Sequence, residues 1–215
     1  NVVAFSTGFR VYANDLQPVS EVARAKDWIS GLEALGGTDI DGALQQAMGM
    51  VDRERSTVIL FLTDGLPTEG ETDAADILDN AEAAAPPNVR MFTFGVGDDV
   101  DTFLLDQLVQ TFRGAGTYVR IGERIDEEVS GLYSKISAPV LTDIELDFDN
   151  MLVEELYPAL PLPDLFAGTQ LIVTGRYRDS GSPTITLTGE LDGDRQVYRY
   201  EVDFPANAGG EVFIP

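Results

Sequence analysis

Residues 57–65 read TVILFLTDG, and this stretch decides the fold class. From Val58 to Leu62 every residue is apolar, so both faces of the strand are expected to be buried, as in a central strand of a parallel sheet. The run ends at Asp64 and Gly65. In open α/β sheets, ligands bind at the carboxyl ends of the strands. The stretch therefore predicts a buried parallel strand that presents a carboxylate at a functional edge.

Strands and helices alternate on both sides of this stretch. Apolar runs and alternating patterns predict strands at 2–6, 9–12, 57–63, 89–97 and 117–121, the first two forming a hairpin. Apolar residues at helical spacing predict helices over 19–32, 40–51, 72–85, 104–112 and 125–136. Repeated β-α units of this kind are typical of a doubly wound, mostly parallel sheet, so we expect an α/β domain over residues 1–138.

The pattern changes at Pro139. From there the apolar and polar residues alternate, which predicts antiparallel strands with one buried face. The segments concerned are LTDIELDF (141–148), LIVTGRY (171–177), TITLTGEL (184–191) and RQVYRYEVDF (195–204). No helical spacing follows residue 138, and LPLPD (160–164) is interpreted as a stiff connector. We place a domain boundary here, with a β-rich segment over 139–215.

The composition excludes several functions. The chain of 215 residues carries 37 acidic and 14 basic residues, a net charge of −23, which disfavours nucleic acid and anionic membrane surfaces as partners. No apolar run approaches the roughly 20 residues that span a bilayer. Because the chain has no Cys and no His, thiolate ligands, imidazole ligands and Ser-His-Asp triads are excluded. Any metal must be held by oxygen, which favours Mg²⁺, Mn²⁺ or Ca²⁺.

Two residues are the candidate ligands of such an ion. Asp64 ends the strand in FLTDGLPTEGET (61–72), and Thr38 lies in LGGTDIDGAL (35–44), at the mouth of a helix. Taken alone, Thr38 is more often a helix cap and Asp64 more often a turn residue. Together, at strand ends, they predict a shared metal site.

Other acidic groups are weaker candidates. Asp98, Asp99 and Asp101 are better explained by helix capping than by metal binding. Glu69 and Glu71 border the predicted site and are expected to tune its field. Asp179-Ser180-Gly181-Ser182 is interpreted as a hairpin turn.

The motifs GGTDIDGAL (36–44) and ILFLTDGLPTEGET (59–72) together resemble the von Willebrand factor A domain, in particular that of the inter-alpha-trypsin inhibitor heavy chain group. NVVAFST (1–7) is similar to the second strand of that group, and VRMFTFGVGDDVDTFLLDQL (89–108) to its fifth strand and following helix. Further similarity to its β-rich segment is carried by ISAPVLTDIELDF (136–148), ELYP (155–158), LPDLFAGTQLIVTGRY (162–177) and EVFIP (211–215).

The resemblance implies a metal-ion-dependent adhesion site, in which Mg²⁺, or Mn²⁺ or Ca²⁺, bridges the domain to an acidic side chain of a protein partner. Thr38 matches the second metal-site motif of the family and Asp64 the third. The first motif, D-x-S-x-S, has no match, because Asn1 already stands at the second strand. We therefore expect weak metal binding by these residues alone, and sheet edges open to self-association.

The expected function is a non-catalytic adhesion or protein-binding module of an extracellular or cell-surface protein. The absence of Cys favours a prokaryotic source. Two alternatives stay open at this point. One is a structural scaffold with a vestigial metal site. The other is a metal-assisted hydrolase using Asp39, Asp64 and Glu69, which the lack of His in the chain and of Lys in the site disfavours.

Overall fold

The computed structural model describes residues 1–34, 36–120, 122–136, 139–166, 170–191 and 193–206, so the EVFIP segment lies outside the described residues. The chain divides into two compact units, residues 1–128 and 129–215. Helix α5 (Ile125–Ile136) crosses that division. The boundary expected between residues 138 and 139 stays a prediction. None of the described helices is long and apolar enough to cross a membrane.

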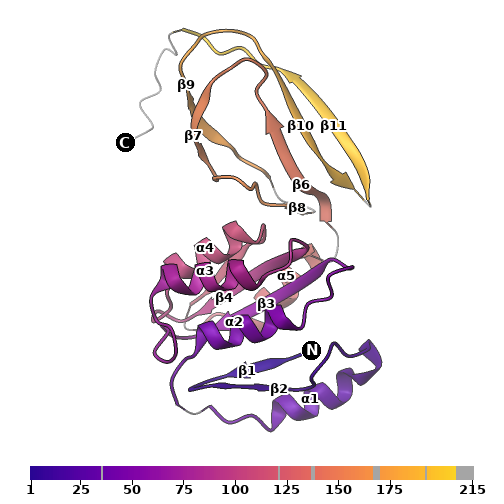
Figure 1. The fold of residues 1–215 in the computed structure, drawn as a ribbon, viewed down its shortest axis with the longest axis vertical. Helices are drawn as coiled ribbons and strands as arrows, with labels where there is room; N and C mark the ends of the chain where they lie inside the picture. The colour runs from indigo at the N-terminus through magenta and orange to yellow at the C-terminus, as the bar shows by residue number, and fades with distance from the viewer. Residues whose placement is uncertain (35, 121, 137–138, 167–169, 192, 207–215) are drawn as a thin grey trace. The chain divides into compact units, whose positions relative to one another are not determined.

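The first unit contains a parallel sheet and a separate hairpin (Figure 1). The hairpin pairs β1 (Val3–Phe5) with β2 (Phe9–Val11) in antiparallel fashion, as predicted. The parallel sheet has the order β3-β4-β5, with bounds Thr57–Thr63, Val89–Val96 and Gly116–Val119. This order corrects one prediction. Strand β3 lies at an edge of the described sheet, and β4 is the central strand, because an apolar run reports the polarity of its two faces and not how many strands pair with it.

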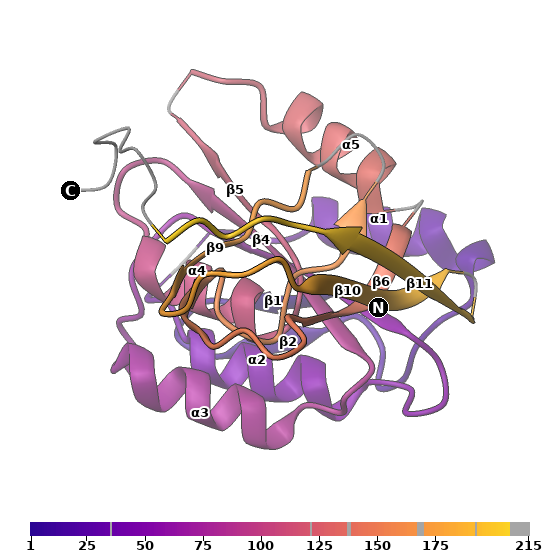
Figure 2. The ribbon, with the colours of Figure 1, turned by 90° about the horizontal axis from the view of Figure 1, so that it is seen from above.

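Helices cover one face of the parallel sheet. Helix α1 (Val22–Ser30), preceded by a turn of 3-10 helix (Val19–Glu21), follows the hairpin. The covering helices are α2 (Ile40–Gly49), α3 (Ala74–Ala84) and α4 (Thr102–Thr111), of which α2 and α3 lie side by side (Figure 2).

The core of the first unit lies between these helices and the strands. Its buried members are Ile40, Leu44, Met48, Phe61, Ile77, Ala81, Val89, Met91, Leu104, Leu105, Leu108 and Phe112. Burying these side chains is the main driving force for docking the helices on the sheet.

After α5, the described part of the second unit is antiparallel β, as the alternating pattern predicts. One sheet has the order β11-β10-β6-β8 and a second pairs β7 with β9. The strands are β6 (Pro139–Asp147), β7 (Val153–Tyr157), β8 (Leu165–Phe166), β9 (Thr174–Tyr177), β10 (Thr184–Leu191) and β11 (Asp194–Glu201). No helix follows residue 136 in the described part of the chain.

Two interpretations of the second unit need correction. Residues 179–182 are not a hairpin turn, because β9 and β10, which they join, belong to different sheets. Instead, Gly181 forms a bridge with Phe204 through two backbone hydrogen bonds. Residues 160–164 are more than a connector. Leu162 is 1% exposed and packs in the core with Leu141 and Ile144.

Candidate functional site

Asp64 lies at the carboxyl end of β3, and the loop that carries Thr38 passes beside the next residue, Gly65. Asp64 directly follows Thr63, the last residue of that strand, and Thr38 lies in the loop before α2. A Cβ atom on Gly65 would lie 3.6 Å from Thr38 Oγ1. The loop that carries Thr38 therefore touches the residue next to Asp64. Thr38 is half-buried and Asp64 is exposed.

Hydrogen bonds to the backbone of Thr38 hold the two loops against each other. The N–H of Thr38 donates to Thr68 Oγ1 at 2.8 Å. The carbonyl oxygen of Thr38 accepts from the N–H groups of Thr68 at 3.0 Å and of Glu69 at 3.3 Å. Because these bonds use only the backbone of Thr38, they orient its side chain without occupying the hydroxyl.

A third loop, which contains Ser6 and Thr7, lies at the same edge. Its presence there was not predicted from the sequence. The N–H of Asp39 donates to the carbonyl oxygen of Ser6 at 2.7 Å, and the N–H of Gly37 donates to Thr7 Oγ1 at 3.0 Å. Ser6 and Thr7 directly follow β1. One feature of the sequence could have indicated this loop: NVVAFST ends in two hydroxyl residues, Ser6 and Thr7, directly after a strand, just as Asp64 directly follows β3.

Helix α2 is capped by Asp39, so the capping alternative for Thr38 is wrong. The side chain of Asp39 accepts from the N–H of Gly42 at 2.9 Å. Within the described ranges, neither Thr38 Oγ1 nor the Asp64 carboxylate makes a hydrogen bond or an ion pair. Among the residues that the structure describes, a hydroxyl and a carboxylate without a hydrogen-bond partner thus lie near the end of β3.

Two of the other acidic candidates, Asp101 and Glu71, accept hydrogen bonds from backbone N–H groups near the starts of helices. Asp101 caps α4 by accepting from the N–H of Leu104 at 2.9 Å, which confirms the capping interpretation for this residue. Glu71 accepts from the N–H groups of Thr72 and Asp73, just before α3. The carboxylate of Glu69 packs against Gly37, beside Thr38. Glu69 is therefore close enough to influence the field at the site, as predicted for it from the sequence.

The oxygen atoms of Thr38 and Asp64 are of the type that a hard divalent cation prefers, but two ligands are too few to complete its coordination shell. A hydroxyl and a carboxylate are oxygen ligands of the kind that Mg²⁺, Mn²⁺ and Ca²⁺ prefer. Among the residues that the structure describes, no group of three or more Asp, Glu, His or Cys side chains is placed to hold an ion. Such an ion would need further oxygens beyond Thr38 and Asp64 to complete its shell.

Comparison with known proteins supports the sequence resemblance. Residues 1–119 match the family model described as von Willebrand factor type A domain. The chain is 30% identical to human inter-alpha-trypsin inhibitor heavy chain H4 over 201 residues, which cover 87% of this chain and 21% of that protein. It is 34% identical to human heavy chain H6 over 192 residues, covering 82% and 14% respectively. The chain thus spans about a fifth or less of these relatives.

A solved structure shows the same fold. The von Willebrand factor type A protein from Catenulispora acidiphila superposes with a TM-score of 0.65 at 20% sequence identity. The match covers 93% of this chain and 55% of that one. It supports an α/β fold, with a parallel sheet and helices, that continues into antiparallel sheets.

Proposed function

Because this chain belongs to the von Willebrand factor type A domain family and is related to the inter-alpha-trypsin inhibitor heavy chains at about 30% identity, we propose that it binds a protein partner through a divalent ion held at Thr38 and Asp64. Domains of this type are generally non-catalytic binding modules. The partner contributes an acidic side chain to the ion, and the parent protein works outside the cell or on its surface.

One observation carries the proposal: Thr38 Oγ1 sits 3.6 Å from the Cβ position of Gly65, next to Asp64. Both oxygen donors lie at the carboxyl end of a parallel strand, the edge where open α/β sheets bind ligands. The capping role that could otherwise have explained Thr38 belongs to Asp39. The ion would supply positive charge at this edge and so attract a carboxylate to a chain whose net charge is −23.

The hydrolase alternative has little support in this geometry. Asp39, its first candidate residue, is half-buried and already accepts a hydrogen bond from the start of α2. A general base must instead be within hydrogen-bond reach of the proton that it removes from a substrate.

The test is a titration of Mn²⁺ into the chain, followed by water-proton relaxation, which detects weak binding. We expect Asp64→Ala to abolish the specific binding phase and Thr38→Val to weaken it. Asp98→Ala is the matched control, because Asp98 is also an exposed aspartate that closely follows a strand, β4. If Asp98→Ala loses Mn²⁺ binding and Asp64→Ala retains it, the assignment of the site to Thr38 and Asp64 is wrong. Equal binding in all variants would show only diffuse attraction to the acidic surface and would favour the scaffold.

A further inference from the structure

The chain contains three Asp-Gly pairs, at residues 41–42, 64–65 and 192–193. Such a pair can rearrange spontaneously, because glycine has no Cβ atom to keep its backbone nitrogen away from the preceding carboxyl group and its backbone adopts many conformations. The rearrangement is slow where a helix or hydrogen bonds hold either group. Asp192 lies outside the described residues, so the structure compares the first two pairs.

The pair Asp41-Gly42 is held in place at the start of α2. The two carboxylate oxygens of Asp41 accept hydrogen bonds, one from Gln45 at 2.7 Å and the other from Asn80 at 3.1 Å. The N–H of Gly42 donates to Asp39 Oδ1 at 2.9 Å. A reaction between the two groups would have to break these bonds and unwind the first turn of the helix. This pair is therefore protected.

The pair Asp64-Gly65 is restrained much less. It lies in a bend after β3, outside any helix or strand, and Asp64 is exposed. Within the described ranges, the Asp64 carboxylate has no hydrogen-bond or ion-pair partner. The N–H of Gly65 donates to Thr63 Oγ1 over a long distance of 3.4 Å. Neither reacting group is therefore held firmly.

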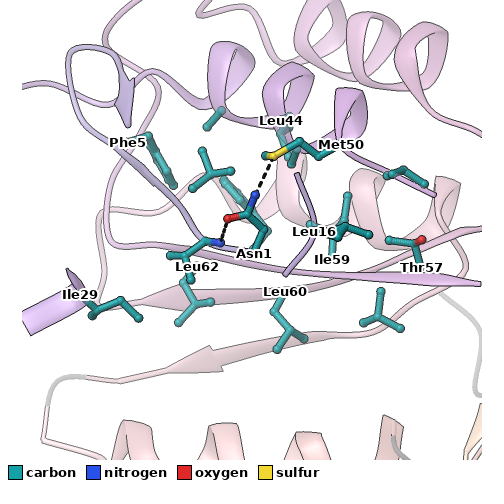
Figure 3. A pocket seen from close by; sticks show the side chains of 17 residues that line it. Asn1, Phe5, Leu16, Ile29, Leu44, Met50, Thr57, Ile59, Leu60 and Leu62 are labelled. Atoms are coloured by element: carbon teal, nitrogen blue, oxygen red, sulfur yellow. Dashed lines mark hydrogen bonds between the residues drawn. The ribbon is translucent and has the colours of Figure 1, made fainter. Parts of the chain in front are cut away.

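The bend is also open, unlike the strand before it. Residues 57–62 of β3 line a mostly apolar cavity of about 560 Å³ (Figure 3), and neither Asp64 nor Gly65 belongs to that lining. In the described part of the chain, apart from chain neighbours, the Cβ position of Gly65 has one atom within 4 Å, Thr38 Oγ1. The carboxyl group of Asp64 therefore has room to turn towards the backbone nitrogen of Gly65, and water has access to it.

The rearrangement consumes no reagent other than water. The backbone nitrogen of Gly65 attacks Cγ of Asp64, and a carboxyl oxygen leaves as water together with the amide proton, which closes a succinimide ring. Water then opens the ring at one of its two carbonyl carbons. Opening at the carbonyl of the α-carbon leaves Gly65 bonded through the former side chain, which is isoaspartate. Overall no atom is gained or lost, and nothing is oxidised.

We propose that Asp64-Gly65 is a site of spontaneous isoaspartate formation and that this change inactivates the metal site. Isoaspartate lengthens the backbone by one carbon and attaches the free carboxylate directly to the α-carbon, so the carboxylate no longer stands where Asp64 presents it beside Thr38. The inactivation rests on the metal binding proposed above, whereas the isomerisation does not. An ion that holds the carboxylate would also keep it away from the nitrogen of Gly65 and so protect the site.

Mass spectrometry of stored protein tests the isomerisation. The chain is stored in warm neutral buffer with EDTA and digested with trypsin, which places Asp41 in residues 27–53 and Asp64 in residues 56–90. Electron-transfer fragmentation distinguishes isoaspartate from aspartate at each position, and fresh protein gives the background. We expect at least about tenfold more isoaspartate at Asp64, because the reaction at Asp41 requires local unfolding of α2. Equal fractions at the two positions, or none at Asp64, would overturn the proposal.

Gly65→Ala tests the role of the glycine. Its methyl group hinders the attack by the backbone nitrogen, so isoaspartate at Asp64 should fall several-fold. Gly8→Ala is the matched control, because its Cβ position is also open and Gly8 does not follow an aspartate. Circular dichroism checks that both variants are folded. No fall in Gly65→Ala, or an equal fall in Gly8→Ala, would overturn the proposal.

Mn²⁺ separates this inference from the metal site on which it acts. Storage with Mn²⁺ should reduce isoaspartate at Asp64 several-fold and leave Asp41 unchanged. The isomerised chain should lose Mn²⁺ binding in proportion to its isoaspartate content at Asp64. Full Mn²⁺ binding by the isomerised chain would overturn the inactivation. A fresh chain that binds no Mn²⁺ and still isomerises at Asp64 would support the modification and show that the metal site is wrong.

Discussion

The side chain of Thr38 lies beside Gly65 in a neighbouring loop, with 3.6 Å between Thr38 Oγ1 and the place where a Cβ atom on Gly65 would stand. This distance is an ordinary van der Waals contact, so the position has room for a methyl group. Gly65 does not require a positive φ angle either. The contact therefore offers a way to cover the Thr38 hydroxyl without disturbing the fold.

We predict that Gly65→Ala weakens Mn²⁺ binding while leaving the chain folded. The added methyl group would lie over Thr38 Oγ1 and hinder an ion from reaching it. The free energy of unfolding should be unchanged or raised by up to about 1 kcal/mol, since alanine restricts the unfolded chain. Denaturant unfolding and the Mn²⁺ titration measure the two effects. Gly8→Ala is the control, because no atom lies within 4 Å of its Cβ position. Unchanged Mn²⁺ binding in Gly65→Ala would remove Thr38 from the site.

We predict that Asp39 is needed for stability as a hydrogen-bond acceptor. Asp39→Ala removes the cap that accepts from the N–H of Gly42 and should lower the free energy of unfolding by about 1 kcal/mol. Asp39→Asn keeps an acceptor oxygen, so its free energy of unfolding should fall much less. Denaturant unfolding of both variants tests this. If the free energy of unfolding falls equally in Asp39→Ala and Asp39→Asn, the charge of Asp39 stabilises the fold and its capping hydrogen bond does not.

The fold could be predicted from the sequence wherever the signal is local. Strand β4 and helices α2 to α4 follow from apolar runs and helical spacing, and Asp39, Asp73 and Asp101 each stand at the start of a helix as capping residues. The pairing of strands could not be predicted in this way, because it depends on residues far apart in the chain. The edge position of β3 and the separation of β9 from β10 into two sheets were therefore not predictable from their own residues.

The candidate site, like the fold, could be predicted from the sequence only in part. The place of Asp64 at the carboxyl end of β3 follows from the strand pattern and the rule that ligands bind at such ends. Thr38 lies in the loop between α1 and α2, and no described strand directly precedes it. The involvement of Ser6 and Thr7 does not follow from the sequence, because it depends on a backbone bond from Asp39 to the Ser6 carbonyl and a bond from Gly37 to the Thr7 hydroxyl. Neither bond leaves a periodic pattern in the sequence.

We predict that Tyr118 makes the stability of the first unit fall in alkali. Partial burial of the Tyr118 side chain, which is 39% exposed, and then the hydrogen bond from its hydroxyl to Asp106 Oδ1 at 2.6 Å, raise the pKa of Tyr118 above its ordinary value. Below a pH of about 10 the phenol is protonated in both the folded and the unfolded chain, so its contribution is fully present. Above that pH the unfolded chain releases the proton and the folded chain retains it. Stability must then fall as the pH rises.

Urea unfolding at pH 8 and pH 11 measures this dependence. Tyr118→Phe should reduce the loss of stability between the two pH values. Tyr157→Phe, at a side chain that is 73% exposed, should leave it unchanged. The chain has only two lysines, Lys26 and Lys135, so few ammonium groups titrate over the same range. A pH dependence that Tyr118→Phe does not alter would contradict the assignment.

We predict that Gly114→Ala strongly destabilises the first unit. Gly114 follows α4 and passes against the backbone of β4, where a Cβ atom would lie 1.6 Å from the carbonyl oxygen of Met91. Since the clash is with backbone and not with a flexible side chain, β4 or the turn must move. The turn is held by the bond from the N–H of Gly114 to the Val109 carbonyl at 2.8 Å. Overpacking of this kind should lower the free energy of unfolding by about 3 kcal/mol.

Denaturant unfolding of Gly114→Ala beside Gly49→Ala tests the clash. Gly49 is the last residue of α2 and has no atom within 4 Å of its Cβ position, so alanine there adds a methyl group to open space. Alanine is also the better helix former. Gly49→Ala should therefore be as stable as the parent chain or slightly more stable. A loss of stability in Gly114→Ala no greater than in Gly49→Ala would mean that the turn after α4 does not approach β4 as closely as the contact with Met91 requires.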